Sequence, residues 1–149
     1  MYKKILFAGC LVTLAVAVGL TTSCSQKTHK GKIGLTCMDL TNPFFKLIAN
    51  VMEEEANKYG YKIVALSADK DAAKQNSQIA DFIAQGYDAI FLNPTDSKGA
   101  LEGVKAAHAA GIPVFTYDVQ VEGDGVEDLI VSHIGSDNYQ GGQIGRAHV

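Results

Sequence analysis

The sequence predicts a doubly wound α/β domain, in which a parallel β-sheet has helices packed on both faces. Strand-like and helix-like stretches alternate from residue 32 to residue 134, and this alternation is typical of parallel strands joined by helices. The strand-like stretches are apolar at successive positions, as in Ala-Ile-Phe-Leu at residues 89–92. Strands of this kind are buried on both faces, as they are between two layers of helices.

Three glycines mark a repeated strand–helix unit. Gly60, Gly86 and Gly111 each end a helix-like stretch and stand directly before strand-like residues. Glycine is expected just past the last helical residue, because it takes the left-handed conformation without a Cβ clash. We therefore expect five strands, over residues 32–37, 61–67, 88–93, 112–118 and 129–134.

The helices between these strands have recognisable starts and buried sides. Asn42 can cap a helix opened by Pro43, because proline at the first helical position gives up an N–H that would be unpaired anyway. A second helix is expected over about 71–85, and a third begins near residue 96 or 97. Apolar residues spaced by three or four positions predict the side of each helix that is buried. They are Phe45, Ile48, Met52, Ala56 and Tyr59 in the first helix, Ile79, Phe82 and Ile83 in the second, and Leu101 and Val104 in the third.

The first 24 residues have the features of an export signal. Two lysines precede an apolar run over residues 5–20, and small residues then lead to Cys24. The run is shorter than the ~20 residues of a membrane-spanning helix, which favours a cleaved signal over an uncleaved anchor, the alternative that stays open. The Thr-Thr-Ser-Cys sequence ending at Cys24 resembles the cleavage box of bacterial lipoproteins. This resemblance implies a lipidated Cys24, followed by a polar tether over residues 25–31, at the cell envelope.

Composition and motifs argue against several classes of function. The 149 residues fit one domain, and 47% hydrophobic residues are enough for a core. The net charge is −3 and no run of Lys or Arg offers a surface for phosphates, so we expect no nucleic-acid partner. The sequence motifs of hydrolases, phosphate-binding loops and zinc proteases are missing, and no Cys or His stands at metal-ligand spacing. We expect a binding protein with no catalytic residue, metal or cofactor, and a free Cys37 in the core.

Polar and aromatic side chains follow two of the strands. Doubly wound sheets bind ligands at the carboxyl ends of their strands, where Asn42, Phe44 and Phe45 follow the first strand and Asp118 ends the fourth. An aromatic ring can stack on the C–H face of a sugar, and amide and carboxylate groups can bind hydroxyls. Structural roles are the alternative: Asn42 would cap the helix, Asp118 would form a turn, and both rings would lie in the core. Because adjacent helical residues point about 100° apart, we expect at least one ring to face the core.

Two further features are interpreted as structural. Asn93 precedes a proline and is held extended, and Thr95 or Asp96 can cap the third helix. The charged residues 69–71 form a similar loop after the second strand and are expected to be solvated. His133 lies within an apolar strand and is interpreted as a core residue with a polar partner.

With these loops in place, the sequence resembles the sugar-binding periplasmic proteins of the ribose and galactose type, which share their fold with the ligand-sensing domains of LacI-type regulators. The motifs that carry the resemblance are Thr-Asn-Pro-Phe-Phe at 41–45, Gly-Tyr at 60–61, Asn-Pro-Thr-Asp at 93–96, Ile-Pro-Val-Phe-Thr-Tyr-Asp at 112–118 and Val-Ser-His-Ile-Gly-Ser-Asp-Asn at 131–138.

The resemblance implies two lobes that close around a sugar at a hinge. It also implies ligand contacts from Asn42, Phe44, Phe45 and Asp118. Ribose binders of this family carry an arginine directly after the aspartate, whereas this chain has Val119. This departure argues against D-ribose itself and leaves another pentose, a hexose or another polyol equally open.

The resemblance also predicts the domain boundaries and the function. Residues 32–136 would form the first lobe, and residues 137–149 the hinge crossover and the start of a second lobe that we expect to be truncated. The expected function is to capture a sugar-like solute outside the cytoplasm, in the periplasm or on the outer side of a membrane, for the permease of a transporter. A ligand-sensing module of an envelope receptor is the alternative. An envelope hydrolase and a LacI-type repressor are disfavoured, because no nucleophile and base can be assigned and a signal peptide stands where DNA-binding helices would be.

Overall fold

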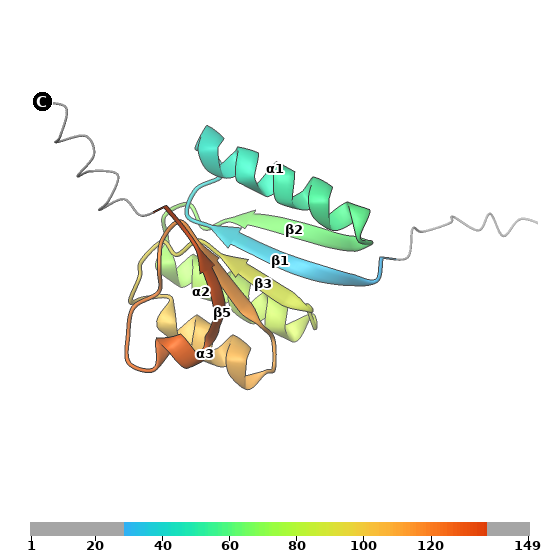
Figure 1. Ribbon diagram of the computed structural model, residues 1–149. Helices are drawn as coiled ribbons and strands as arrows, with labels where there is room; N and C mark the ends of the chain where they lie inside the picture. Colours follow the sequence, from blue (N-terminus) through green and yellow to red (C-terminus); the bar gives the residue numbers. More distant parts are fainter. Residues whose placement is uncertain (1–28, 137–149) are drawn as a thin grey trace, which may run out of the picture.

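The computed structural model describes residues 29–136, which form a five-stranded parallel sheet with helices on both faces (Figure 1). The strands are β1 (Gly31–Cys37), β2 (Tyr61–Ser67), β3 (Ala89–Leu92), β4 (Val114–Tyr117) and β5 (Ile130–Ile134). The helices are α1 (Pro43–Lys58), α2 (Ala72–Ala84) and α3 (Leu101–Ala109), and a short 3-10 helix, η1 (Val126–Asp128), precedes β5. The predicted doubly wound α/β fold is confirmed. The predicted signal and lipidated cysteine (1–24), most of the tether, and residues 137–149 lie outside the described residues.

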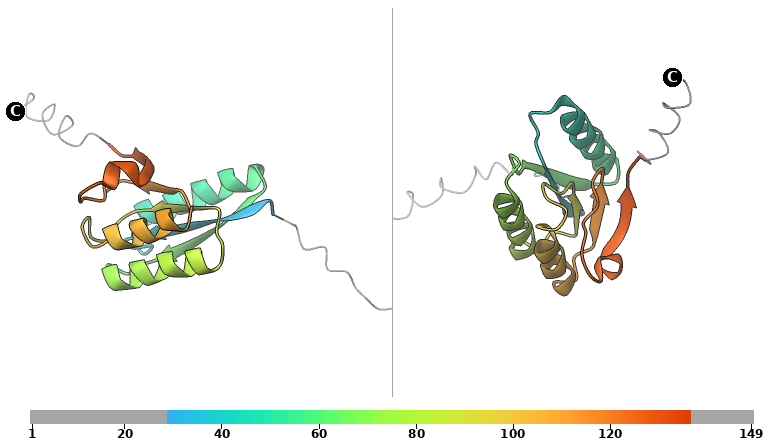
Figure 2. Two further views of the ribbon diagram at one scale, coloured as in Figure 1. Left: turned by 90° about the horizontal axis from the view of Figure 1, so that it is seen from below. Right: turned by 90° about the vertical axis from the view of Figure 1, so that its left-hand side faces the viewer.

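The strand order, β2-β1-β3-β4-β5, determines where a ligand can bind. The chain moves from β1 outward to β2, then returns across β1 to β3 and continues to β4 and β5. Because crossovers between parallel strands are right-handed, this reversal puts α1 on one face of the sheet and α2 and α3 on the other (Figures 1 and 2). The loops after β1 and β3 therefore leave toward opposite faces, and ligands of doubly wound sheets bind at such a point.

Each face of the sheet has its own apolar cluster. The buried members under α1 are Leu35, Cys37, Phe45, Ala49, Ile63 and Tyr117. The cluster under α2 and α3 includes Ile79, Phe82, Ile90, Leu92, Val104 and Val114. β1 passes so close to the Phe82 ring that only a glycine fits, since a Cβ on Gly34 would lie 2.5 Å from Phe82 Cδ2. Burial of this kind supplies most of the free energy that holds such a domain together.

The predicted helix signals are confirmed at several ends. Asn42 Oδ1 accepts a hydrogen bond from the Phe44 N–H at 3.0 Å, and Pro43 occupies the first turn of α1. The three glycines that precede strands have left-handed backbones, with φ of 85° at Gly60, 65° at Gly86 and 74° at Gly111. These conformations allow each helix to turn directly into the next strand.

Two details of the helices were predicted wrongly. Tyr59 is not on the buried side of α1: it lies one residue past the helix end, where Gly60 redirects the chain, and is 63% exposed. The third helix begins at Leu101 rather than near residue 96 or 97. Asp96 accepts hydrogen bonds from the N–H groups of Lys98 and Gly99 and so holds a separate turn ahead of the helix. An aspartate side chain competes with helical hydrogen bonding in this way.

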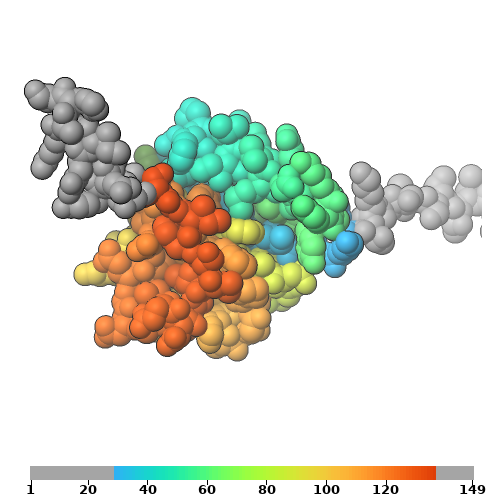
Figure 3. Space-filling view, viewed as in Figure 1, coloured from blue at the N-terminus to red at the C-terminus, as the bar shows by residue number. Residues whose placement is uncertain are grey.

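β5 forms one edge of the sheet and is exposed on the surface seen in Figure 3, with Val131 at 60% and Ile134 at 64% exposure. His133 is partly buried, and its Nδ1 lies 2.9 Å from Thr116 Oγ1, which confirms a polar partner for this ring. Cys37 is a free, fully buried thiol, as predicted, and burial raises its pKa. Within residues 29–136, no helix is long and apolar enough to cross a membrane.

Candidate functional site

The predicted site residues lie at the carboxyl edge of the sheet. Asn42 and Phe44 stand at the start of α1, after β1, and Asp118 directly follows β4. One strand, β3, separates β1 from β4. Asn93, which follows β3, links the two loops: its Oδ1 accepts the Met38 N–H at 3.2 Å, and its Nδ2 donates to Asp118 Oδ2 at 3.2 Å.

Asp118 presents its carboxylate from a tightly held turn. Its φ of 65° lies in the left-handed region, which costs a non-glycine residue about 1 kcal/mol but is more accessible to aspartate than to most residues. The Asp118 N–H donates to the Ile134 carbonyl at 2.9 Å, so the turn is joined to β5. The residue is exposed, and within residues 29–136 its Oδ1 makes no hydrogen bond. Among the described residues, this oxygen is thus left to accept hydroxyl groups of a ligand.

Asn42, Phe44 and Phe45 have distinct environments. The Asn42 cap uses its Oδ1 on Phe44, whereas its Nδ2 donates to no group among the described residues. Phe44 is 56% exposed and Phe45 only 6%, which confirms that at least one ring faces the core. The two rings meet edge to face, with centroids 5.3 Å apart and planes at 66°. Phe45 thus packs between α1 and the sheet and supports the exposed Phe44 ring.

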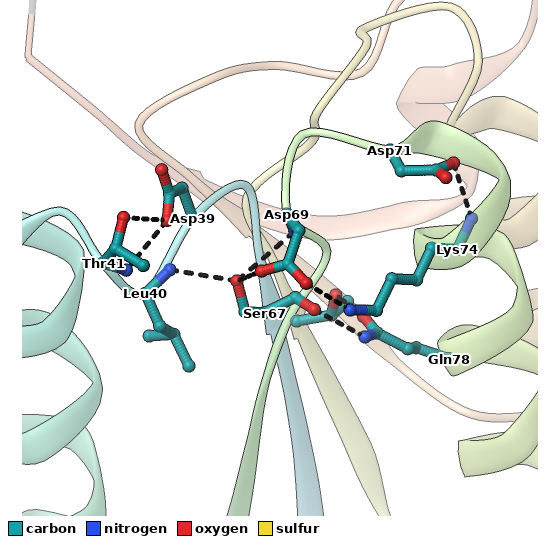
Figure 4. Close-up of polar contacts among 9 residues, drawn as sticks. Asp39, Leu40, Thr41, Ser67, Asp69, Asp71, Lys74 and Gln78 are labelled. Atoms are coloured by element: carbon teal, nitrogen blue, oxygen red, sulfur yellow. Dashed lines mark hydrogen bonds and ion pairs between the residues drawn. The ribbon is translucent and has the colours of Figure 1, made fainter.

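Hydrogen bonds fix the loop between β1 and α1 (Figure 4). Asp39 Oδ1 accepts from both the hydroxyl of Thr41, at 2.6 Å, and its N–H, at 2.8 Å. The Thr41 bonds hold the pKa of Asp39 below its usual value, and Lys70 Nζ, 3.4 Å from Asp39 Oδ2, acts in the same direction. The Leu40 N–H donates to Ser67 Oγ at 3.2 Å, which joins this loop to the end of β2.

The loop after β2 is charged, as predicted, and its charges pair with groups outside the loop: Asp69 with Lys74 of α2 and Lys70 with Asp39. Asp69 and Lys70 both have left-handed backbones, with φ of 54° and 62°. The Asp69 carboxylate pairs with Lys74 and accepts the Ser67 hydroxyl at 2.6 Å. These contacts, from Lys74 first, hold the pKa of Asp69 below its usual value. The loop closes one end of the carboxyl edge of the sheet with exposed polar groups (Figure 4).

Sequence reasoning missed the part played by Asn93 and by two glutamines of α2. The sequence predicts a structural role for Asn93, held extended before Pro94, but not that its fully buried side chain contacts both site loops. Gln75 and Gln78 are 1% and 8% exposed. Their positions fall on the same side of α2 as the apolar residues Ile79 and Phe82, and a buried amide needs partners. The sequence therefore shows that these two glutamines are buried, but it does not show which groups they bind.

The doubly wound fold is typical of domains that bind a ligand at the carboxyl edge of the sheet. The chain belongs to the family of the periplasmic binding protein domain, whose family model matches residues 33–147. The resemblance to sugar-binding members predicted from the loops is confirmed by its relatives.

Two curated relatives and one solved structure illustrate this similarity. The ribose import binding protein RbsB of Bacillus subtilis (strain 168) is 37% identical over 150 residues, a match that covers 93% of this chain and 48% of the relative. The D-apiose import binding protein of Paraburkholderia graminis is 36% identical over 135 residues, covering 90% and 42%. The Caulobacter myo-inositol binding protein bound to myo-inositol has a TM-score of 0.70 at 28% identity, covering 80% of this chain and 38% of that one. The chain thus spans less than half the length of these proteins.

Proposed function

We propose that this chain supplies one wall of a binding site for a sugar or a sugar-like polyol. The observation that carries the proposal is the Asn93 link, which holds the Asp118 carboxylate and the loop that leads to Asn42 at one edge of the sheet. Within residues 29–136, Asn42 offers an amide donor without a partner, Asp118 a carboxylate oxygen without a partner, and Phe44 an exposed ring. A sugar ring has the complementary chemistry, because hydroxyl groups surround apolar C–H faces.

Within this proposal the four residues have different roles. Asn42 and Asp118 bind hydroxyls, and Phe44 stacks on the ring of the ligand. Phe45 lies beneath Phe44 and is 6% exposed, so its part is mainly to support the Phe44 ring. Val119 is partly buried and brings no charge next to Asp118. These features favour a neutral polyol, and the missing charge next to Asp118 favours one other than D-ribose itself.

The proposed role of the protein is to capture this solute outside the cytoplasm for the permease of a membrane transporter. The support is that the ribose and D-apiose relatives are import binding proteins by name. The signal-like first 24 residues of the sequence also favour export, with a lipid anchor on Cys24. Labelling of cells with radioactive palmitate tests the anchor: the protein should be labelled, and label that persists in Cys24→Ala would contradict it.

Saturation-transfer NMR tests the sugar site, because it detects weak complexes. A site formed by residues 29–136 alone buries less of a ligand than the 70–90% typical of complete pockets, so the assay has to detect dissociation constants as weak as about 1 mM. We expect a signal from at least one of D-ribose, D-apiose and myo-inositol, and its loss in Asp118→Ala. Asp81→Ala, which removes an exposed carboxylate from α2 instead, is the matched control and should keep the signal. No signal from any of the three, or an equal signal in Asp118→Ala, would refute the proposal.

A further inference from the structure

Gln75, on α2, is hydrogen-bonded to the segment that follows β3. Its Nε2 donates to the Asn93 carbonyl at 2.9 Å, and its Oε1 accepts the Thr95 N–H at 2.8 Å. Gln75 is 1% exposed. A buried carbonyl and a partly buried N–H without partners are costly, and in this segment one glutamine side chain satisfies both. The two bonds lie on either side of Pro94 and therefore fix the path of the chain as it leaves the strand.

Asn93 connects this segment to the ligand site. Its own N–H donates to the Thr36 carbonyl at 3.0 Å, which ties it to β1. Its side chain is fully buried and makes three hydrogen bonds: Oδ1 accepts from the Met38 N–H, and Nδ2 donates to the Tyr117 carbonyl and to Asp118 Oδ2, each at 3.2 Å. One amide thus sets the spacing between the loops after β1 and β4. Its reach depends on the backbone that Gln75 holds.

We propose that Gln75 is a positioning residue for the ligand site, acting through Asn93 on the Asp118 carboxylate. The inference rests on the function proposed above. Without the Gln75 amide, the Asn93 carbonyl and the Thr95 N–H would have to turn toward other partners, and the Asn93 side chain would turn with them. Bonds of 3.2 Å on both sides leave little slack, so a small rotation breaks the contact to Met38 or to Asp118.

Gln78 supplies the matched control. It lies one turn further along α2, is 8% exposed and also makes two strong bonds. Its Nε2 donates to the Ser67 carbonyl at 2.9 Å, and its Oε1 accepts the Thr36 hydroxyl at 2.6 Å. It holds β1 and β2 but does not touch Asn93. A purely structural role for Gln75 predicts equal effects of the two glutamines on ligand binding, whereas a positioning role predicts that only Gln75 matters.

The test compares Gln75→Met and Gln78→Met in the full chain. Both remove a buried amide with little change of volume, and we expect similar falls in the midpoint of thermal unfolding. NMR titration with D-ribose, D-apiose and myo-inositol should show about tenfold weaker binding in Gln75→Met, since lost hydrogen bonds to a charged group cost roughly this much. In Gln78→Met the dissociation constant should stay within about twofold of the wild-type value. Equal changes in both variants, or none in Gln75→Met, would overturn the proposal.

A second measurement separates this inference from the proposed function. The side-chain NH2 signals of Asn93 in 1H–15N spectra need no ligand, and buried hydrogen bonds protect such protons from exchange with water. We expect protected signals in the wild type and in Gln78→Met, and their loss in Gln75→Met. If no sugar binds to the wild type, the proposed function fails, while protected Asn93 signals in Gln75→Met would still refute the positioning role. Should Gln75→Met not fold, Gln75→Asn keeps an amide that is one methylene too short for the Asn93 carbonyl and is judged by the same criteria.

Discussion

Phe44 and Phe45 are adjacent in the first turn of α1, and we expect Phe45 to stabilise the fold and Phe44 to bind the ligand. Truncation of each to alanine removes the same atoms and the same edge-to-face contact at 5.3 Å. The structure nevertheless predicts different results, because Phe45 is 6% exposed and Phe44 56%. Phe45→Ala should destabilise the fold, whereas Phe44→Ala should mainly affect the ligand.

The magnitudes follow from burial. Phe45 belongs to the cluster under α1, so its loss leaves a cavity and should lower the free energy of unfolding by about 3–5 kcal/mol. Phe44 keeps more than half of its surface in water, and its loss should cost about 1 kcal/mol, most of it from the aromatic pair. Urea unfolding followed by circular dichroism measures both values. The expected difference of at least about 2 kcal/mol is well above the error of such extrapolations.

The ligand assay completes this test. Phe44→Ala, folded and nearly as stable as the wild type, should lose the saturation-transfer signal of the sugar that the wild type binds. Equal free-energy losses in the two variants would contradict the assignment of Phe45 to the core. A Phe44→Ala protein that binds as well as the wild type would remove this ring from the site.

Three further outcomes are expected. Gly34→Ala should lower the free energy of unfolding by about 1–3 kcal/mol in thermal denaturation, because its Cβ would lie 2.5 Å from the Phe82 ring; an unchanged midpoint would contradict this packing. Asn42→Ala should cost about 1 kcal/mol through the lost cap, whereas Asn42→Asp should keep the stability but weaken sugar binding, since it lacks the amide donor; parallel losses of stability and binding would argue for a cap alone. The Thr41 bonds lower the folded-state pKa of Asp39, so its stabilisation is complete above the unfolded pKa of about 3.9 and is lost as pH falls through the folded-state value. Asp39→Asn should therefore flatten the acid limb of the stability curve, and identical limbs would refute this effect.

The alternation of elements was predictable because local signals and tertiary packing agree. Continuous apolar runs specify strands between helix layers, and Gly60 and Gly86 adopt the left-handed backbone expected of residues that end helices. The errors arose at helix ends, where local hydrogen bonding and turns compete with continuation of the helix. Tyr59 matches the apolar period of α1, yet the helix ends before it. Asp96 caps a turn of its own before the third helix begins.

The candidate site was predictable only in part. The positions of Asn42 and Asp118 at strand ends follow from the repeat, since parallel strands end at the same edge. The contacts that connect them do not: Asn93 meets Asp118 across 25 residues and Gln75 across 18. A sequence shows that a polar residue falls on a buried face, but it does not show which distant backbone group the residue satisfies. The network that holds the loops therefore had to come from the structure.

The central claim is that sugar binds at the carboxyl edge of the sheet, between the loops after β1 and β4. Mapping of 1H–15N chemical-shift changes during titration with D-ribose, D-apiose or myo-inositol tests it most directly. We predict that the backbone signals of Phe44 and Asp118 and the side-chain signals of Asn42 move together. Signals of Gly86 and Gly111, in the turns that lead into β3 and β4 at the opposite edge, should stay in place. Shifts confined to that opposite edge, or no shifts with any of the three sugars, would contradict the account.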